Sequence, residues 1–172
     1  MADREHIRTA FERSAKAVSL RPAVGQGTAT TTVRVREGLH CDIEDGPWKL
    51  EADLGDSLGG ESAAPDPGVF GRSALGACLA QAYALWAATL DVPLDEIEVQ
   101  VHSDYDSRGM LGIDGPSPGW TGLRYTVSVA SSAPEADVRR VLDAADAHSP
   151  LLDDFSKSFE IGREVSIRAT GG

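Results

Sequence analysis

The sequence predicts an α+β fold, and three features of the 172-residue chain support this prediction. Short segments that alternate apolar and polar residues occur in two groups, at residues 29–54 and 97–129. Helical patterns separate these groups instead of following each strand, which favours antiparallel hairpins over a parallel sheet. The longest helical pattern, residues 67–90, is apolar on nearly every side and predicts a buried central helix.

The N-terminal third is expected to form one helix and a small sheet. Asp3 is a plausible N-cap for an amphipathic helix that ends before Pro22. Three short strands with turns between them should follow as an antiparallel meander, at residues 29–35, 39–43 and 48–54. Residues 55–66 are rich in Gly, Ser and acids, so we expect a loop that leads to the central helix.

The second half is expected to add a hairpin, a helix and a last strand. The hairpin strands are predicted at residues 97–105 and 123–129, with a Gly- and Pro-rich connection at 109–122. Ser132 and Glu135 have capping-box spacing ahead of a helix that Pro150 closes. The last strand is expected from the apolar residues Phe159, Ile161, Val165 and Ile167. We expect residues 1–22 to be a helical extension and residues 23–172 to form one domain.

Composition and charge exclude several function classes. An apolar content of 41% and a charged content of 25% are typical of a globular protein. The formal net charge of −11, without any basic run, argues against nucleic acid or an anionic membrane surface as a partner. Arg72 and Gln81 interrupt the central helix, which disfavours a membrane span. The charged N-terminus is no secretory signal, so we expect a cytoplasmic protein.

No cofactor or metal ion is expected. The two cysteines, Cys41 and Cys78, cannot make a metal site alone, and the histidines show no metal-ligand spacing. No phosphate-binding loop or nucleotide fingerprint is present. His148 is interpreted as a contact at a helix C-terminus instead of a catalytic base.

Cys78, the lone cysteine of the central helix, is the best candidate for chemistry. Its surroundings, Leu-Gly-Ala-Cys-Leu-Ala, are small and apolar, so it is either a packing residue or a reactive thiol. A thiolate attacks peroxides, but a free cysteine is mostly protonated at neutral pH. Because Cys78 lies about three turns into the helix, the helix dipole cannot stabilise a thiolate there. A cation from elsewhere is needed, and arginine suits this role.

From about Thr28 to Ile167 the chain resembles the OsmC/Ohr family of osmotically inducible and organic hydroperoxide resistance proteins. The resemblance rests on the order of elements, on the small-residue helix around Cys78, on Asp66-Pro67-Gly68 ahead of it, and on Ala-His-Ser-Pro at 147–150. It implies strongly curved antiparallel sheets around a long buried central helix, in an intertwined homodimer with two interfacial sites. It also implies reduction of organic hydroperoxides by a peroxidatic thiolate, a resolving cysteine and an Arg–Glu pair.

Two of the four functional positions that the resemblance implies are changed in this chain. Cys78 matches the peroxidatic cysteine, but Ser149 stands at the position of the resolving cysteine and Gly68 at that of the glutamate. Arg36 is the best counterpart of the arginine, with Arg34 as the alternative. The missing glutamate could be replaced by Glu61 or Asp66.

Two functions remain open. The first is a peroxidase with a single peroxidatic cysteine that is recycled by an external thiol reductant, because Ser149 cannot resolve a sulfenic acid and Cys41 is interpreted as structural. Its substrate would be a small organic hydroperoxide, in a pocket lined by apolar residues such as Phe70, Leu75, Leu79 and Trp86. The alternative is a non-catalytic dimer that binds a small apolar ligand at its interface.

Overall fold

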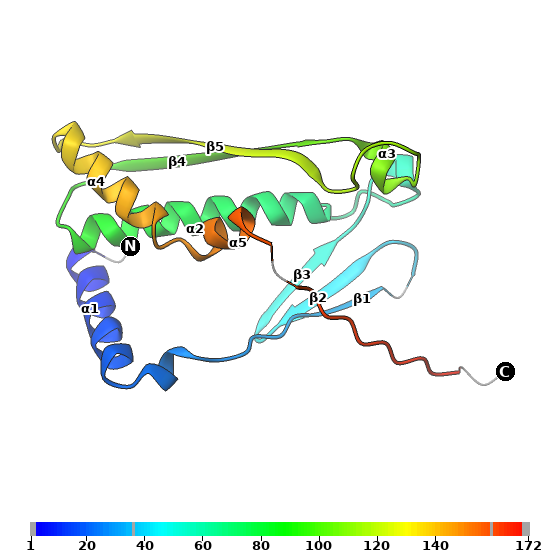
Figure 1. Ribbon diagram of the computed structural model, residues 1–172, viewed down its shortest axis with the longest axis horizontal. Helices are drawn as coiled ribbons and strands as arrows, with labels where there is room; N and C mark the ends of the chain where they lie inside the picture. The colour runs from blue at the N-terminus through cyan, green and yellow to red at the C-terminus, as the bar shows by residue number, and fades with distance from the viewer. Residues whose placement is uncertain (1–2, 36, 159, 170–172) are drawn as a thin grey trace.

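The computed structural model describes residues 3–35, 37–158 and 160–169, and it has the predicted α+β architecture (Figure 1). A long central helix, α2 (Pro67–Thr89), lies under a two-stranded sheet, and a separate three-stranded sheet lies below the N-terminal half of α2 in the view of Figure 1. The N-terminal helix α1 (Arg4–Leu20) contacts the opposite end of α2.

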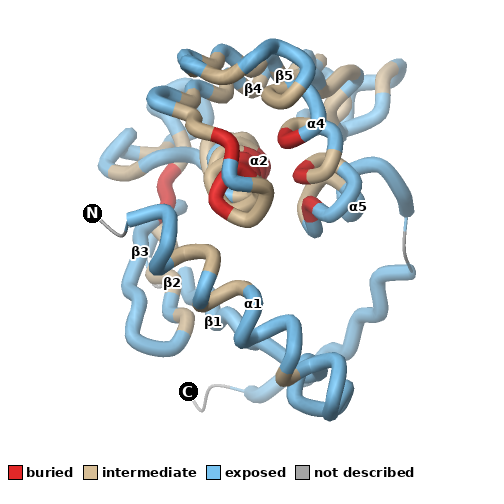
Figure 2. Tube along the Cα trace, turned by 90° about the vertical axis from the view of Figure 1, so that its left-hand side faces the viewer, coloured by how far each residue is buried: buried red, intermediate tan, exposed pale blue. Residues whose placement is uncertain are grey.

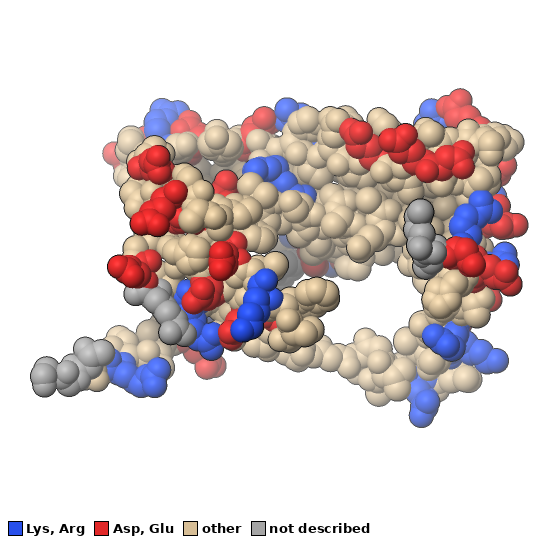
Figure 3. Space-filling model, turned by 180° about the vertical axis from the view of Figure 1, so that it is seen from behind, with Lys and Arg blue, Asp and Glu red and all other residues tan. Residues whose placement is uncertain are grey.

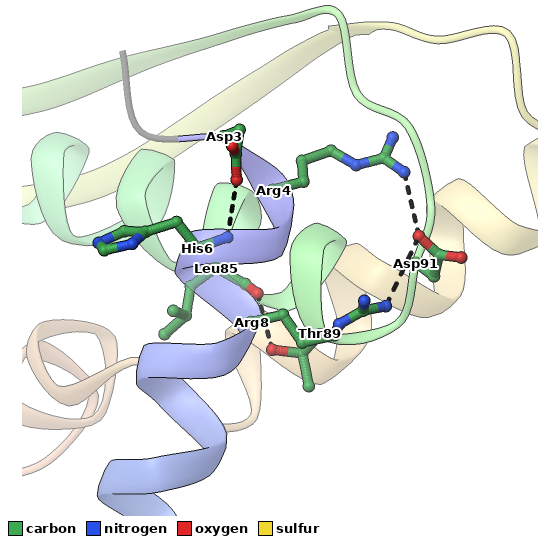
Figure 4. A network of polar contacts seen from close by, with 7 residues as sticks. All are labelled: Asp3, Arg4, His6, Arg8, Leu85, Thr89 and Asp91. Atoms are coloured by element: carbon green, nitrogen blue, oxygen red, sulfur yellow. Dashed lines mark hydrogen bonds and ion pairs between the residues drawn. The ribbon is translucent and has the colours of Figure 1, made fainter.

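Helix α1 begins where the sequence predicted. The Asp3 side chain accepts a hydrogen bond of 2.7 Å from the backbone N–H of His6, which satisfies one free donor of the first turn. Figure 4 shows this cap next to the C-terminal end of α2. The guanidinium groups of Arg4 and Arg8 lie 3.2 and 4.0 Å from the Asp91 carboxylate. Both ion pairs are exposed, so each contributes at most about 1 kcal/mol.

One aromatic contact adds to these ion pairs. The ring of Phe11 on α1 lies 5.8 Å from the ring of Trp86 on α2. None of the residues 4–20, all of which the structure describes, is fully buried. Helix α1 is therefore an attached element at the end of the core and not part of it (Figure 2).

The predicted meander is present but its strands are shorter than expected. Strands β1 (Thr32–Val35), β2 (Cys41–Asp45) and β3 (Trp48–Ala52) pair antiparallel in this order. Val33 lies opposite Ile43, which lies opposite Leu50, so all three share one face of the sheet. Trp48 is 70% exposed and Leu50 49% exposed on that face. An apolar face is thus left uncovered in this protomer.

The loop between β3 and α2 is organised by Asp53, which lies just beyond β3. This side chain is 3% exposed and accepts backbone N–H bonds from Leu54, Glu61 and Ala63 at 2.8, 3.0 and 3.1 Å. These hydrogen bonds hold the pKa of the Asp53 carboxyl below its ordinary value of 3.8, and the bond from Ala63 has the largest effect. The loop also contains a short 3₁₀ helix, η2 (Asp56–Leu58), which the sequence did not predict.

Replacing Asp53 with asparagine should loosen this loop at neutral pH. Because the folded pKa is lowered, the carboxylate stabilises the loop above the unfolded pKa of about 3.9 and loses this effect as the pH falls through the folded value. Wild-type amides of residues 54–64 should therefore lose hydrogen-exchange protection only in acid, whereas Asp53→Asn should lack it throughout. Asp56→Asn, at an exposed acid of the same loop, is the control. Equal exchange in both variants would contradict this role.

The second sheet and its helices form the core. Strands β4 (Glu96–Tyr105) and β5 (Trp120–Ala130) form the predicted hairpin, and their inward residues pack on α2 and α4 (Glu135–Asp146). The largest fully buried side chains are Tyr83, Leu75, Leu79 and Val141. Figure 2 shows this buried centre around α2, while α1 and the first sheet are mostly exposed.

Two local expectations were wrong, and one helical turn was not predicted. The capping box does not form, since Pro134 occupies the N-cap of α4 and has no side-chain cap bond. Pro150 does not close that helix but begins a further one, α5 (Pro150–Ser156), where its fixed φ suits the first turn. The connection between β4 and β5 also contains a helical turn, α3 (Ser107–Met110).

The expected last strand is also absent from the described part of the protomer. Phe159 lies outside the described residues, and residues 160–169 form an exposed extended segment without strand pairing. The reason is physical: alternating residues favour an extended backbone, but a strand needs a neighbour for its hydrogen bonds. Figure 1 shows this segment leading away from α5 and from the core.

Helix α2 is less buried than the sequence predicted. The small or polar residues on one of its faces are exposed in this protomer, namely Ser73, Ala74, Ala77 and Gln81. Figure 3 shows an opening through the molecule between the core, the N-terminal segment and the first sheet, and the surface of the core along it is largely uncharged. Within the described ranges, every helix is too short or not apolar enough to span a lipid bilayer.

Candidate thiol site

Cys78 and Ser149 meet between α2 and the start of α5. The Cys78 Sγ lies 3.4 Å from the Ser149 Oγ, within hydrogen-bonding distance, and either atom can be the donor. Ser149 is 2% exposed, whereas Cys78 is half-buried at the edge of the exposed α2 face. The sulfur therefore has a buried hydroxyl on one side and partial access to solvent on the other.

The position of Ser149 depends on the C-terminal end of α4. Asp146, the last residue of this helix, accepts hydrogen bonds from the hydroxyls of Tyr83 at 2.7 Å and Tyr125 at 3.0 Å. Burial, followed by the neighbouring Asp146 carboxylate, raises the pKa of both tyrosines. The backbone N–H of Ser149 then donates to the Asp146 carbonyl at 3.3 Å.

An aromatic contact holds α5 over the Cys78 side of α2. Phe155 of α5 stacks on Trp120 of β5 with ring centroids 5.9 Å apart. Trp120 in turn lies so close to α2 that a Cβ at Gly71 would be 2.8 Å from its ring. Gly71 is seven residues before Cys78 and therefore on the same helix face, two turns away. The small residue lets the Trp120 ring approach this face closely.

His148 makes the helix-end contact that its position indicated. Its Nδ1 lies 2.7 Å from the Ala144 carbonyl oxygen in the last turn of α4, and its ring lies 4.8 Å from that of Trp86. This geometry fits an Nδ1–H donor that satisfies a terminal helix carbonyl. The His148 ring therefore links the turn that carries Ser149 to the aromatic contact between Phe11 of α1 and Trp86 of α2.

Among the described residues, the arginines that could supply a cation to the sulfur make other contacts. Arg36 lies outside the described residues, and Arg34 on the exposed strand β1 forms an ion pair of 2.9 Å with Glu44. Arg72 donates to the Ser103 hydroxyl at 3.3 Å. Among the described arginines, none forms a hydrogen bond with the Cys78 Sγ. This site is thus incomplete as far as the protomer is described.

Of the two residues that could replace the glutamate, Asp66 has a structural contact through its side chain, and Glu61 has one through its backbone. Asp66 is the N-cap of α2 and accepts from the backbone N–H groups of Gly68 and Val69 at 2.7 and 3.2 Å. The backbone N–H of Glu61 binds Asp53 in the preceding loop. At Gly68 a Cβ would lie 2.9 Å from the Asp66 carboxylate and 3.3 Å from the Arg72 guanidinium, so a glutamate there would crowd both groups.

The expected apolar lining of a ligand pocket is not found as one group in this protomer. Leu75 and Leu79 are fully buried in the core of this protomer, and Phe70 lines a depression beside Ile43 and Leu50 of the first sheet.

The second cysteine lies apart from Cys78, on the first sheet. Cys41 is half-buried on β2, with its Sγ 3.8 Å from the Leu39 carbonyl oxygen. Among the described residues, both cysteines are free thiols and no cluster of three or more potential metal ligands occurs.

Sequence reasoning missed two features of the site. The tyrosine pair on Asp146 involves three elements that are distant in sequence, and no local motif marks it. No motif in the sequence marks Arg72 as a site residue, although it lies beside Gly68 and lines a depression of about 450 Å³ with Asp66 and Trp120.

Comparisons with solved structures find the same fold in several proteins. The chain is similar to an OsmC-like protein from Mycoplasma pneumoniae, with a TM-score of 0.61 and 14% identity over 76% of this chain and 89% of that one. For an organic hydroperoxide resistance protein OsmC from Legionella pneumophila, the TM-score is 0.56 and the identity is 15%, over 74% of this chain and 88% of that one. For a putative organic hydroperoxide resistance protein from Vibrio cholerae, which has captopril bound in one of its active sites, the TM-score is 0.52. The identity is 17%, over 74% of this chain and 83% of that one.

At this identity the structures establish the fold alone. A comparison with curated proteins finds no match. The family model described as OsmC-like protein matches residues 59–162, which is more than half of the chain and includes both Cys78 and Ser149. The chain therefore belongs to the OsmC-like protein family.

Proposed function

We propose that the protein is a thiol-dependent peroxidase that reduces organic hydroperoxides through Cys78. The observation that carries this proposal is the half-buried Cys78 sulfur with the buried Ser149 hydroxyl 3.4 Å away. A hydroxyl that donates to sulfur stabilises the thiolate relative to the thiol, and the thiolate is the nucleophile. Membership of a family whose solved relatives include organic hydroperoxide resistance proteins supports the same reaction.

The reaction needs one cysteine and two equivalents of an external thiol. The Cys78 thiolate attacks the terminal oxygen of the hydroperoxide, the O–O bond breaks, and the leaving alkoxide takes a proton to give the alcohol. Cys78 becomes a sulfenic acid. An external thiol then forms a mixed disulfide and releases water, and a second one restores Cys78 and leaves as the disulfide. Ser149 cannot form a disulfide, so recycling depends on this reductant, which fits a reducing, cytoplasmic location.

The cation that the thiolate needs is proposed to come from the first hairpin of a second copy. Arg36 remains the proposed residue, with Arg34 as the alternative. In the family resemblance this arginine belongs to an interfacial site, and Cys78 borders the exposed α2 face. An arginine supplied there would hold both the sulfur and the peroxide oxygen through its planar fork.

A homodimer is proposed on three further observations. The apolar face of the first sheet, the small-residue face of α2 and the alternating C-terminal segment are all uncovered in this protomer. A three-stranded sheet with an open apolar face is unfavourable in water, and a second copy could cover all three surfaces at once. In this assembly residues 23–172 would form the shared domain, with residues 1–22 as an attached extension.

The test is the consumption of cumene hydroperoxide in the presence of a dithiol. We expect catalytic consumption by the wild type and no consumption above background by Cys78→Ser, since only a thiolate supplies the nucleophile. Cys41→Ser is the matched control and should keep most of the activity, because Cys41 lies on β2 of the three-stranded sheet and not on α2. Equal consumption by the wild type and Cys78→Ser would end the peroxidase proposal.

One set of observations favours a second candidate, a non-catalytic dimer that binds a small apolar ligand. Ser149 and Gly68 occupy two functional positions of the family, and no described arginine bonds to the sulfur. The putative organic hydroperoxide resistance protein from Vibrio cholerae has captopril bound in one of its active sites, so a site of this fold can hold a small molecule. Saturable binding of an apolar fluorescent probe, unchanged in Cys78→Ser and without peroxide consumption, would favour this candidate.

A further inference from the structure

The geometry points to Asp146 as a positioning residue that holds Ser149 against Cys78. Asp146 does not touch the sulfur, and it acts through the turn that joins α4 to α5. For catalysis this inference rests on the proposed function, but the positioning itself is independent of any reaction.

The Asp146 carboxylate joins three elements. One oxygen accepts from the Tyr83 hydroxyl of α2 at 2.7 Å, and the other accepts from the Tyr125 hydroxyl of β5 at 3.0 Å. Tyr83 is fully buried, so its hydroxyl cannot turn to water if Asp146 is lost. Burial and the carboxylate raise the pKa of both tyrosines, so both remain donors at physiological pH. The end of α4 is thereby fixed to α2 and β5.

The same residue controls the turn through its backbone. The Asp146 carbonyl accepts the Ser149 N–H at 3.3 Å, three residues later. Tyr83 and Cys78 belong to one helix and are five residues apart, so the carboxylate and the sulfur have a common rigid reference. A short hydrogen-bonded turn therefore transmits the position of Asp146 to the Ser149 hydroxyl. Without the carboxylate, the turn is free to shift relative to α2.

Ser149→Cys provides a reporter of this position, because the new thiol can form a disulfide with Cys78. The equilibrium between this disulfide and a glutathione buffer measures how often the two groups meet. Adding Asp146→Ala should lower the equilibrium constant for formation of this disulfide by about tenfold. The reduction potential of the disulfide then becomes less negative by about 30 mV. Tyr125→Phe, which removes a single hydroxyl and keeps the fold, should give a smaller shift in the same direction. Asp146→Asn, which keeps one acceptor oxygen, should restore part of the loss.

Val92→Ala is the control for general destabilisation, because it truncates a 4% exposed side chain in the other core cluster. It should leave the potential unchanged. An unchanged potential in both Asp146→Ala and Tyr125→Phe, or an equal shift in Val92→Ala, would overturn the inference. No hydroperoxide is used, so a failure here is distinct from a failure of the peroxidase proposal, which the Cys78→Ser assay detects.

Discussion

Ser149→Cys is expected to change the product of hydroperoxide oxidation from a sulfenic acid to an intramolecular disulfide. The Ser149 Oγ already lies 3.4 Å from the Cys78 Sγ, and a short movement would bring two sulfurs to the bonding distance of about 2.05 Å. Groups held in contact meet at an effective concentration above the millimolar level of flexible linkers. The disulfide should therefore form more than about tenfold faster than reaction with a millimolar external thiol.

Thiol titration and non-reducing peptide mapping after one equivalent of cumene hydroperoxide would measure this product. Ser156→Cys is the matched control, because it adds the same thiol to the far, exposed end of α5. It should form no disulfide with Cys78. If Ser149→Cys retained a free thiol at position 78 after oxidation, or reacted like the control, the contact between these two positions would not exist in solution.

Leu50→Asp is expected to dissociate the proposed dimer. Leu50 lies on the open apolar face of the first sheet, next to Ile43 across the strand pair. If a second copy covers this face, the variant buries an unpaired carboxylate in each half of the interface, which costs several kcal/mol. Even a loss of about 2.7 kcal/mol in the free energy of dimer formation raises the dissociation constant 100-fold.

Sedimentation velocity over a dilution series would show the change. Lys49→Asp is the control, because strand alternation places its carboxylate on the opposite, polar face. The control should remain a dimer at concentrations at which Leu50→Asp is a monomer or unfolds. A wild type that sediments as a stable folded monomer at micromolar concentration would contradict the dimer itself.

The elements predicted correctly are those whose pattern is local. The Asp3 cap and the apolar spacing of α1, the uninterrupted apolar run of α2 and the alternation of β4 and β5 each specify their own backbone. The C-terminal segment shows the limit of such patterns. Its alternation predicts a strand, but a strand exists only with a neighbour, and the described residues of this protomer do not supply one.

The site was predictable only in part, for a similar reason. The family resemblance identified positions 78 and 149 as a functional pair, and the structure places their side chains in contact. Helix α5, which begins at Pro150, was missed because seven residues carry too little periodicity. The Asp146 contacts were missed because their tyrosines come from α2 and β5, and a single sequence contains no signal for such long-range partners.

The most direct measurement of the central claim is the mass of the intact protein after exposure to one equivalent of an organic hydroperoxide without any external thiol. If Cys78 is the peroxidatic residue, the protein should gain one oxygen atom, peptide mapping should place it on Cys78, and a sulfenic-acid trap should label the same residue. Two results would show that this account of the site is wrong. In the first, Cys78 remains a free thiol and the hydroperoxide stays intact. In the second, Cys78 remains a free thiol and the oxygen is found on Cys41 or a methionine.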